Sequence, residues 1–387
     1  MLSVEAISDG PLSTDFGPFR GRVWLNSAHQ GPLPRCAIPH VMDALERKLE
    51  PHRIDDDSFV AVPARLKAAL SRLLNAPVGE IILGNSTSYG LHLLANGIPL
   101  QEDDEVLLAE GDFPATILPW CGLRRRGVHV SFVPLGEAPI SCASIDAVLT
   151  RRTRVVCLSW VNSFTGIAID LNAIGELCRS HQIWFVVNGS QAVGTRALDV
   201  SRTSVDAVAG CGFKWLCGPY GTGFCWVRSA LLDQLDYNQR YWLPELWGTE
   251  SAFSHRPDGP PALGAQRYDV FCTANFLNVM PWTAAVEHLL DVGIERIQRH
   301  NEGLAATFVD ALDRGRFRLV SPPVPQQRSS IVAFSCIDPS NNVHIHRQLA
   351  QAGIDIALRR GDLRLSPHLF NSGAEIAAAL GVLHESE

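Results

Sequence analysis

Short apolar runs alternate with amphipathic stretches from residue 61 to residue 227. The stretch AVPARLKAALSRLLN, at 61–75, has apolar residues at helical spacing and is expected to form a helix. Further helices are expected at 85–98, after a turn, at 117–127 and at 172–182. The apolar runs have the length of strands, and they lie at 80–83, 105–108, 128–135, 154–158, 183–187, 207–209 and 223–227.

Strands that alternate with helices predict an α/β protein, with a mostly parallel sheet that helices cover on both faces. Right-handed crossovers then place the carboxyl ends of the strands, and the functional loops, at one edge of the sheet. From about Met280 the pattern changes to long helices, followed by SSIVAFSCI, another helix and LRLS. We therefore expect an N-terminal arm at 1–20, a large α/β domain at 21–268 and a smaller α+β domain at 269–387. The stretch 231–268, rich in Trp, Tyr, Pro and Gly, is expected to wrap the site or an interface.

Composition narrows the class of protein. The 387 residues are 46% hydrophobic and 19% charged, which excludes a disordered chain. A net charge of −7 argues against a nucleic-acid partner, and neither a signal peptide nor a membrane-spanning run is visible. The ten Cys residues lack CxxC pairs and zinc-site spacing. We therefore expect a cytoplasmic protein with reduced thiols that binds no nucleic acid, membrane or metal.

Lysine is rare in this chain, so a catalytic lysine has few candidate positions. There are three, Lys48, Lys67 and Lys214. Lys48 and Lys67 lie on expected helices beside other charges, and we expect both on solvated faces. Lys214 lies in the apolar, glycine-rich stretch GCGFKWLCGPYGTG. Burial there would lower its pKa and suit imine chemistry, whereas a snorkelling or paired lysine is the structural alternative.

Three other motifs carry polar groups at the ends of expected elements. NSTSYG, at 85–90, offers hydroxyls and backbone N–H groups at a helix N-terminus, which suit an anion, although N-capping alone would explain them. NGSQAVG, at 188–194, follows a buried strand, where polar side chains are costly unless they bind something or form a satisfied turn. Arg364, in the LRLS strand, could clamp a carboxylate or form a structural ion pair.

An anion cup, a desolvated lysine and polar strand ends together describe a site for pyridoxal phosphate (PLP). At these residues the chain resembles the class V aminotransferase-like group of fold type I PLP enzymes. That group includes kynureninases, cysteine desulfurases and isopenicillin N epimerase-like proteins. The resemblance runs from about Val23 to Leu383, and NGSQAVG followed by GFKWLCGPYGTGF is its most specific part. It implies a large domain with a mostly parallel seven-stranded sheet between helices.

The resemblance assigns cofactor-binding roles to several residues. Lys214 resembles the lysine that forms the Schiff base with PLP, and Ser86 and Thr87 resemble the phosphate-binding pair. Phe113, in DFPAT, matches the aromatic residue that stacks on the ring in kynureninase-like members. Gln191 resembles the residue that hydrogen-bonds the ring oxygen.

Further positions resemble residues around the substrate and the subunit interface. Asn162 and Ser163, in WVNSFTG, resemble a polar loop near the ring. Thr273, in CTANF, matches a threonine that reaches the phosphate of the neighbouring subunit, so a homodimer with active sites at its interface is implied. Arg364 resembles the arginine that holds the substrate α-carboxylate. Candidate specificity residues lie near His29 and in the segment 241–247.

The chain departs from the family pattern at three places. Asn188 stands where the group has an Asp that pairs with the pyridine nitrogen, and a neutral amide holds that nitrogen protonated only poorly. Phe213 stands before Lys214 where many relatives have His or Tyr. The residues 359–362, Arg-Arg-Gly-Asp, occupy the place where desulfurases of this group carry the persulfide cysteine.

These departures favour a PLP-dependent lyase that acts on an amino-acid substrate, by C–S β-elimination from an S-substituted cysteine. Elimination expels a leaving group and needs less carbanion stabilisation than transamination. The alternatives are a class V aminotransferase, an epimerase, or a decarboxylating or oxidative deaminating enzyme of secondary metabolism. A protein of this fold that binds ligand without catalysis is a further alternative, which Asn188 and Phe213 suggest.

Overall fold

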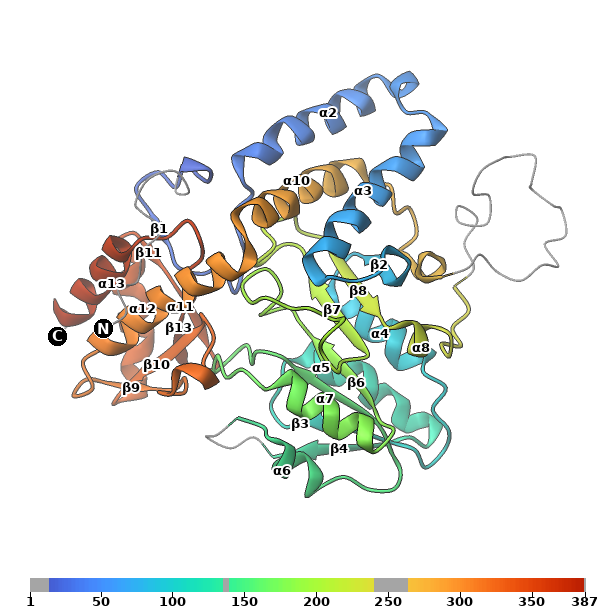
Figure 1. Ribbon diagram of the computed structural model, residues 1–387. Helices are drawn as coiled ribbons and strands as arrows, with labels where there is room; N and C mark the ends of the chain where they lie inside the picture. Colours follow the sequence, from blue (N-terminus) through green and yellow to red (C-terminus); the bar gives the residue numbers. More distant parts are fainter. Residues whose placement is uncertain (1–13, 135–138, 240–263, 386–387) are drawn as a thin grey trace, which may run out of the picture.

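The computed structural model describes residues 14–134, 139–239 and 264–385. Its central sheet has seven strands (Figure 1), in the order β2, β8, β7, β6, β5, β3, β4. Strand β8 runs antiparallel to both of its neighbours and the other pairs are parallel, which confirms the predicted mostly parallel sheet. The strands are β2 (Ile81–Gly84), β3 (Glu105–Ala109), β4 (His129–Val133), β5 (Thr153–Ser159), β6 (Trp184–Asn188), β7 (Ala207–Cys211) and β8 (Gly223–Val227).

Successive residues of these strands enter two different apolar cores. In β3, Leu107 packs with one core, whereas Val106 and Leu108 pack with the other. This period of two buries both faces of the sheet, as expected for parallel strands. One core contains α3 (Asp56–Leu74), α6 (Cys142–Asp146) and α7 (Leu171–Ser180). The other contains α4 (Thr87–Gly97), α5 (Pro114–Cys121) and α8 (Ser229–Leu232).

A second, antiparallel sheet lies beside the first unit, in the order β12, β13, β10, β9. Its strands are β9 (Phe317–Leu319), β10 (Val332–Cys336), β12 (Ala357–Arg359) and β13 (Asp362–Leu365). The helices α11 (Ile294–Ala311), α12 (Asn342–Gln351) and α13 (Gly373–Glu385) pack with it around a third core. This is the smaller C-terminal α+β unit that the sequence predicts.

The N-terminal segment joins this C-terminal unit across almost the whole length of the chain. Strand β1 (Val23–Trp24) pairs in parallel with β11 (Ile354–Asp355). The Arg22 guanidinium forms a salt bridge with Asp355 at 2.7 Å. Leu25 is fully buried in the C-terminal core. The segment that leads to His29 is therefore fixed by residues more than 300 positions later.

Helix α10 (Phe276–Val292) belongs by its packing to the larger unit. Trp282 and Val286 lie in the core that covers the central sheet. Together with α2 (Ile38–Leu49) and α3, α10 forms a layer at the top of Figure 1. The domain limits at 20 and 268 stay a prediction, and most of the stretch 231–268 lies outside the described residues.

None of the helices in the described ranges is long and apolar enough to cross a membrane. Within the same ranges no group of three or more His, Cys, Asp or Glu side chains is arranged to hold a metal ion.

The expectation that Lys67 lies on a solvated face is wrong. Its side chain is 10% exposed, and its Nζ lies 2.7 Å from the carboxylate of Asp269, which is 7% exposed. Asp269 also accepts the backbone N–H of Leu83 at the first edge strand. Burial raises the pKa of Asp269, although Lys67 and that N–H oppose the shift. Charged neighbours in sequence did not reveal a partner two hundred residues away.

We expect Lys67→Met to lower the free energy of unfolding by about 3–5 kcal/mol, because it leaves the Asp269 carboxylate buried without its cation. Urea denaturation would measure the change. Lys48→Met, at an exposed position of α2, should change stability by less than about 0.5 kcal/mol. Similar losses for the two variants would contradict a stabilising role for the buried pair.

Candidate active site

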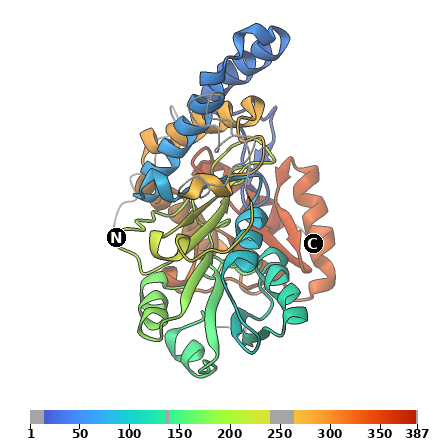
Figure 2. The ribbon, with the colours of Figure 1, turned by 90° about the vertical axis from the view of Figure 1, so that its right-hand side faces the viewer.

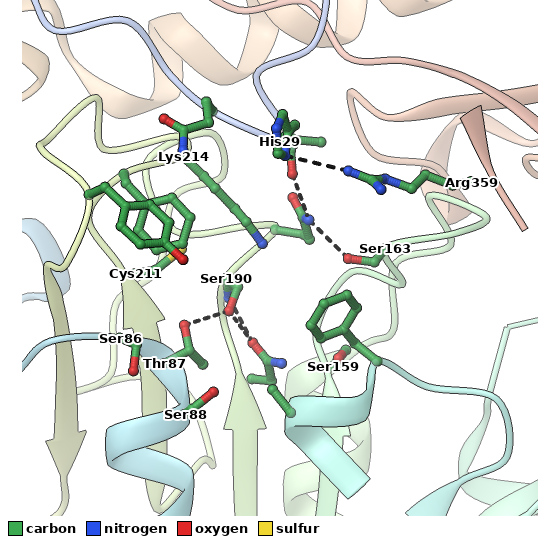
Figure 3. Close-up of a pocket in the computed structure, with 18 of the residues that line it drawn as sticks. His29, Ser86, Thr87, Ser88, Ser159, Ser163, Ser190, Cys211, Lys214 and Arg359 are labelled. Atoms are coloured by element: carbon green, nitrogen blue, oxygen red, sulfur yellow. Dashed lines mark hydrogen bonds between the residues drawn. The ribbon is translucent and has the colours of Figure 1, made fainter. Parts of the chain in front are cut away.

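A cavity of about 630 Å³ opens at the carboxyl ends of the central strands. Asn188 ends β6 and Cys211 ends β7, and both line the cavity. The C-terminal sheet contributes Arg359 and Arg364, and the N-terminal segment contributes His29. The edge that right-handed crossovers predict is therefore the one that holds the cavity (Figure 3).

Lys214 extends its side chain into this cavity, as Figure 3 shows. Its Nζ lies 5.6 Å from the ring centre of Phe113 and 5.9 Å from that of Phe213. Burial lowers the pKa of Lys214, and Arg364 and Arg359 lower it further, whereas Cys211 opposes the shift. No salt bridge joins Lys214 to any described residue, so no carboxylate opposes the lowering of its pKa by burial.

The backbone before Lys214 is held by a close contact with the N-terminal segment. The N–H of Gly31 donates to the carbonyl of Phe213 at 2.9 Å. A Cβ at Gly31 would lie 2.0 Å from the carbonyl oxygen of Lys214. Only glycine allows this approach, so the N-terminal segment fixes the position of the lysine.

The N-terminus of α4 forms the lower left wall of the cavity in Figure 3. Ser86 is the N-cap and accepts the N–H of Tyr89 at 3.3 Å, and the side chains of Thr87 and Ser88 also line the cavity. A Cβ at Gly223 would lie 2.5 Å from the backbone of Ser86, so glycine lets β8 support this turn closely. Backbone N–H groups and hydroxyls at a helix N-terminus suit a phosphate.

Asn188 is buried, and its amide is fully oriented by its neighbours. Its Oδ1 accepts the N–H of Ser190 at 3.0 Å and the hydroxyl of Ser190 at 2.5 Å. Its Nδ2 donates to Thr116 Oγ1 at 2.8 Å. Ser190 Oγ also lies 2.7 Å from Thr87 Oγ1, which joins the strand end to the helix N-terminus.

Gln191 and the loop after β5 are held by hydrogen bonds within the chain. Gln191 Nε2 donates to the carbonyl of Ala28 at 3.0 Å and to Ser163 Oγ at 2.9 Å, and its Oε1 accepts the indole N–H of Trp215. Gln191, predicted from the motif NGSQAVG, and Ser163, predicted from WVNSFTG, both line the cavity. Since both Nε2 hydrogens of Gln191 are already used, Ser163 Oγ is the better placed group to donate to a ligand.

Two predicted residues are not brought to the cavity of their own chain. The Oδ1 of Asn162 accepts the N–H groups of Phe164 and Thr165, so its amide shapes the loop. Thr273 is buried, and its hydroxyl donates to the carbonyl of Val270 at 3.0 Å. Its predicted role concerns a neighbouring subunit and stays a prediction. The segment 241–247 lies outside the described residues.

The substrate end of the cavity carries arginines. Arg364 is 3% exposed, and its Nη1 donates to the carbonyl of Ser163 at 2.8 Å. Its Nε is buried without a hydrogen-bond partner. Burial and the nearby Arg359 lower its pKa to about 10, so it stays charged at neutral pH. A buried cation with an unused donor is a ready site for a carboxylate.

His29 borders the arginines at this end. Its Nδ1 lies 3.4 Å from Arg359 Nη2 (Figure 3). Burial lowers the pKa of His29, and the charges of Arg359, Arg364 and Lys214 lower it further. A neutral imidazole is therefore favoured at neutral pH.

Several residues of the cavity were not predicted as site residues. Cys211 lies three positions before Lys214 in the same motif, and Ser190 lies inside NGSQAVG, so both could have been found there. Phe164 lines the cavity from the loop after β5, and Arg359 lines it from the end of β12. No spacing signal marked them, because their place depends on how the two units pack.

The chain contains the groups that PLP requires: a buried lysine, a helix N-terminus for a phosphate, and an aromatic ring beside the lysine. The unpaired Nε of Arg364 adds a place for the carboxylate of an amino acid. The residues present therefore fit the cofactor.

Comparison with known proteins agrees with this fit. The family described as aminotransferase class-V matches residues 57–375. The isopenicillin N epimerase of Streptomyces clavuligerus is 29% identical over 344 residues, which cover 84% of this chain and 83% of the relative. A probable cysteine desulfurase of Methanothermobacter thermautotrophicus is 25% identical, with 94% of each protein covered.

Solved structures show the same fold. A mutant of C-DES with glycine covalently linked to its PLP cofactor matches with a TM-score of 0.89 at 22% identity, over 97% of this chain and 99% of that one. The cystine C-S lyase C-DES in complex with cysteine persulfide matches with a TM-score of 0.86, over 94% and 97%. The chain therefore belongs to the class V aminotransferase family and is a PLP-dependent enzyme of fold type I.

Proposed function

We propose that the enzyme catalyses C–S β-elimination from an S-substituted cysteine. The observation that carries the proposal is the pairing, in one cavity, of the buried amine of Lys214 with the unpaired buried donor of Arg364. The segment that leads into β13, Arg359 to Asp362, supplies arginines and no cysteine. Among the solved neighbours, the cystine C-S lyase has a reaction of this class.

The side chains have separate tasks in this reaction. Arg364 binds the α-carboxylate and so fixes the substrate, with Ser163 Oγ and His29 beside it. PLP, when bound, withdraws electrons from Cα. Lys214 Nζ, whose pKa burial lowers, accepts the Cα proton, and the rings of Phe113 and Phe213 lie beside the amine. Breaking the Cβ–S bond releases a thiol, and one water converts the remaining fragment to pyruvate and ammonia.

The position of Cys211 favours a lyase over a persulfide-forming desulfurase. This buried thiol lies on the strand ends beneath Lys214 and is the one cysteine among the described residues that line the cavity. A persulfide carrier has to leave the site to pass on its sulfur, and a residue of a central strand is not free to do so.

Racemisation at Cα is the second candidate. Isopenicillin N epimerase is a relative over most of the chain, and both reactions begin with loss of the Cα proton. Its signature would be solvent deuterium at Cα without release of thiol or pyruvate. Transamination, decarboxylation and oxidative deamination would instead show the amine form of the cofactor, carbon dioxide release and oxygen uptake.

We expect the purified enzyme to release equal amounts of pyruvate and thiol from S-substituted cysteines, and Lys214→Ala to lose at least about 10²-fold in rate, because general base catalysis contributes 10²–10⁴-fold. Coupled assays of pyruvate and thiol measure both products. Lys48→Ala is the matched control and should keep full activity. If no S-substituted cysteine yields either product while Cα deuteration proceeds, the elimination proposal fails in favour of the epimerase.

We expect Arg364→Gln to raise KM about 10–100-fold with little change in kcat, because a charge-assisted hydrogen bond to the carboxylate is lost. Steady-state kinetics would measure the shift, and Arg318→Gln, exposed on the same sheet, is the control. The methyl ester of the substrate has no carboxylate, so its KM should respond weakly to the Arg364 substitution. An equal response of acid and ester would contradict the clamp.

We also propose that the enzyme is a homodimer, with α2 at its interface. Four side chains of α2 are apolar and 42–73% exposed, and they lie at helical spacing along one face: Ile38, Met42, Leu45 and Leu49. Figure 2 shows the blue N-terminal helices extending beyond the rest of the molecule. A single-sided apolar stripe on a protruding helix is typical of an interface.

The double substitution Leu45→Glu and Leu49→Glu should convert the dimer to a monomer, because two charges would have to be buried in an apolar interface. Light scattering during size-exclusion chromatography would show it. Ile337→Glu changes an equally exposed residue of the C-terminal unit and should leave a dimer. A native chain that is monomeric would refute the proposal.

A further inference from the structure

His368 is a fully buried histidine that contacts the residue directly after Lys214. It lies in the segment that follows β13, a few positions beyond Arg364. Its Nε2 lies 2.9 Å from the carbonyl oxygen of Trp215, and its ring packs edge-on against the indole, with 5.3 Å between the ring centres. Both side chains have 0% exposure. One short segment therefore carries both the carboxylate clamp and a contact to the lysine loop, residues 212–218.

The Trp215 carbonyl has no other strong hydrogen-bond donor. The two carbonyls before it accept backbone N–H groups, from Gly31 at 2.9 Å and from Cys217 at 3.1 Å. Among the residues that the structure describes, no backbone N–H donates to the Trp215 carbonyl, and the thiol of Cys217, at 3.9 Å, is only a weak donor. Since a buried carbonyl needs a partner, the orientation of this part of the loop depends on His368.

The carbonyl also fixes the tautomer of His368. A carbonyl oxygen can only accept, so Nε2 carries the hydrogen and Nδ1 of the neutral ring is an acceptor. Nδ2 of Asn301, on α11, lies 3.1 Å from that Nδ1 and also donates to Thr195 Oγ1 at 2.9 Å. Burial lowers the pKa of His368 to about 4, although the hydrogen bond to the Trp215 carbonyl raises it. The ring is therefore neutral at neutral pH and has a partner on each nitrogen.

Trp215 connects this contact to the rest of the site. Its indole N–H donates to Gln191 Oε1 at 2.9 Å, and Gln191 Nε2 donates to Ser163 Oγ at 2.9 Å. The carbonyl of Ser163 in turn accepts Nη1 of Arg364 at 2.8 Å. The contacts form a closed circuit, because the chain leads from Arg364 back to the imidazole. The lysine is the neighbour of Trp215 in this circuit, so the amine and the clamp are held by one set of hydrogen bonds.

We propose that His368 is a positioning residue for Lys214, and that its hydrogen bond to the Trp215 carbonyl keeps the amine in register with the carboxylate clamp. A base has to lie within hydrogen-bond reach of the Cα proton while the clamp holds the substrate. This role rests on the part of the proposed function that gives the Cα proton to Lys214. It does not depend on cleavage of the C–S bond.

The first measurement uses the resting holoenzyme without substrate. The Schiff base between Lys214 and PLP changes its visible absorbance when its nitrogen loses a proton. The pKa of that proton depends on a hydrogen bond to the ring oxygen, which weakens as the lysine twists the bond out of the ring plane. We expect His368→Leu to move the midpoint of this titration by at least about 0.5 pH units, because the loop turns when its carbonyl loses its donor.

His368→Gln tests whether the N–H, rather than the ring, matters. Glutamine keeps a donor on a side chain of similar reach, so its midpoint should stay within about 0.2 pH units of the native value. His346→Leu is the matched control, because the imidazole of His346 also bonds a backbone carbonyl, that of Ile356, at 3.1 Å in the C-terminal unit. It should leave the midpoint unchanged.

The second measurement follows loss of the Cα proton from S-methylcysteine in D₂O by ¹H NMR, which counts exchange and elimination alike. His368→Leu should lower kcat for this loss about 10–100-fold, because a misplaced base costs about 10²-fold for a shift of about 1 Å. KM should change less than about threefold, because Arg364 is intact. His346→Leu should keep the native values of both.

Each outcome decides the role of His368. A native midpoint in His368→Leu would overturn it, and so would a His368→Gln midpoint that moves as far as that of His368→Leu. A raised KM with native kcat would also overturn it, because the clamp and not the lysine would have moved. If His368→Leu does not fold, His368→Asn carries the same test, since its shorter amide does not reach the carbonyl. A native enzyme that removes no Cα proton from S-methylcysteine refutes the proposed substrate, and the midpoints of the resting enzymes then decide the role of His368.

Discussion

The active site depends on the requirement that every polar group buried at the carboxyl edge of the central sheet finds a partner. Asn188, Gln191 and Thr87 meet it within the chain, through hydrogen bonds that cross from strand to strand and from sheet to helix. Arg364 is the exception among these residues, because its buried Nε has no hydrogen-bond partner. The rigid groups therefore form a frame, and the unsatisfied cation marks where a ligand has to complete the arrangement.

The cavity is assembled from segments that belong to different cores. The strand ends and α4 come from the larger unit, Arg359 and Arg364 from the antiparallel sheet, and His29 from a segment tied to that sheet. Gly31 makes the contact between these parts, since its N–H holds the backbone of Phe213. A shift of one unit relative to the other would thus change the distance between the amine and the carboxylate clamp. Substrate binding and the placement of the lysine are coupled by packing.

The sequence predicts the architecture well and the finer contacts only in part. Period-two alternation in strands such as β3 and the glycine-rich setting of Lys214 are local signals, and local signals survive in a single sequence. Partners distant in sequence are not visible there. Charged residues near Lys67 on its helix indicated a solvated side chain, yet Lys67 is buried and paired with Asp269. The hydrogen bonds that occupy the side chains of Gln191 and Asn188 depend on side-chain directions that no motif encodes.

The pairing of β1 with β11 constrains the order in which the chain can fold while it is synthesised. A ribosome makes Val23 long before Ile354, and proteins emerge N-terminus first. The early strand has to wait, unpaired, while the residues of both units that lie between are synthesised. The segment that carries His29, and the contact between Gly31 and the backbone before Lys214, therefore reach their final position last. A nascent chain can thus form its central sheet before it has a working site, and the cofactor meets a finished cavity only after the C-terminal unit has closed over it.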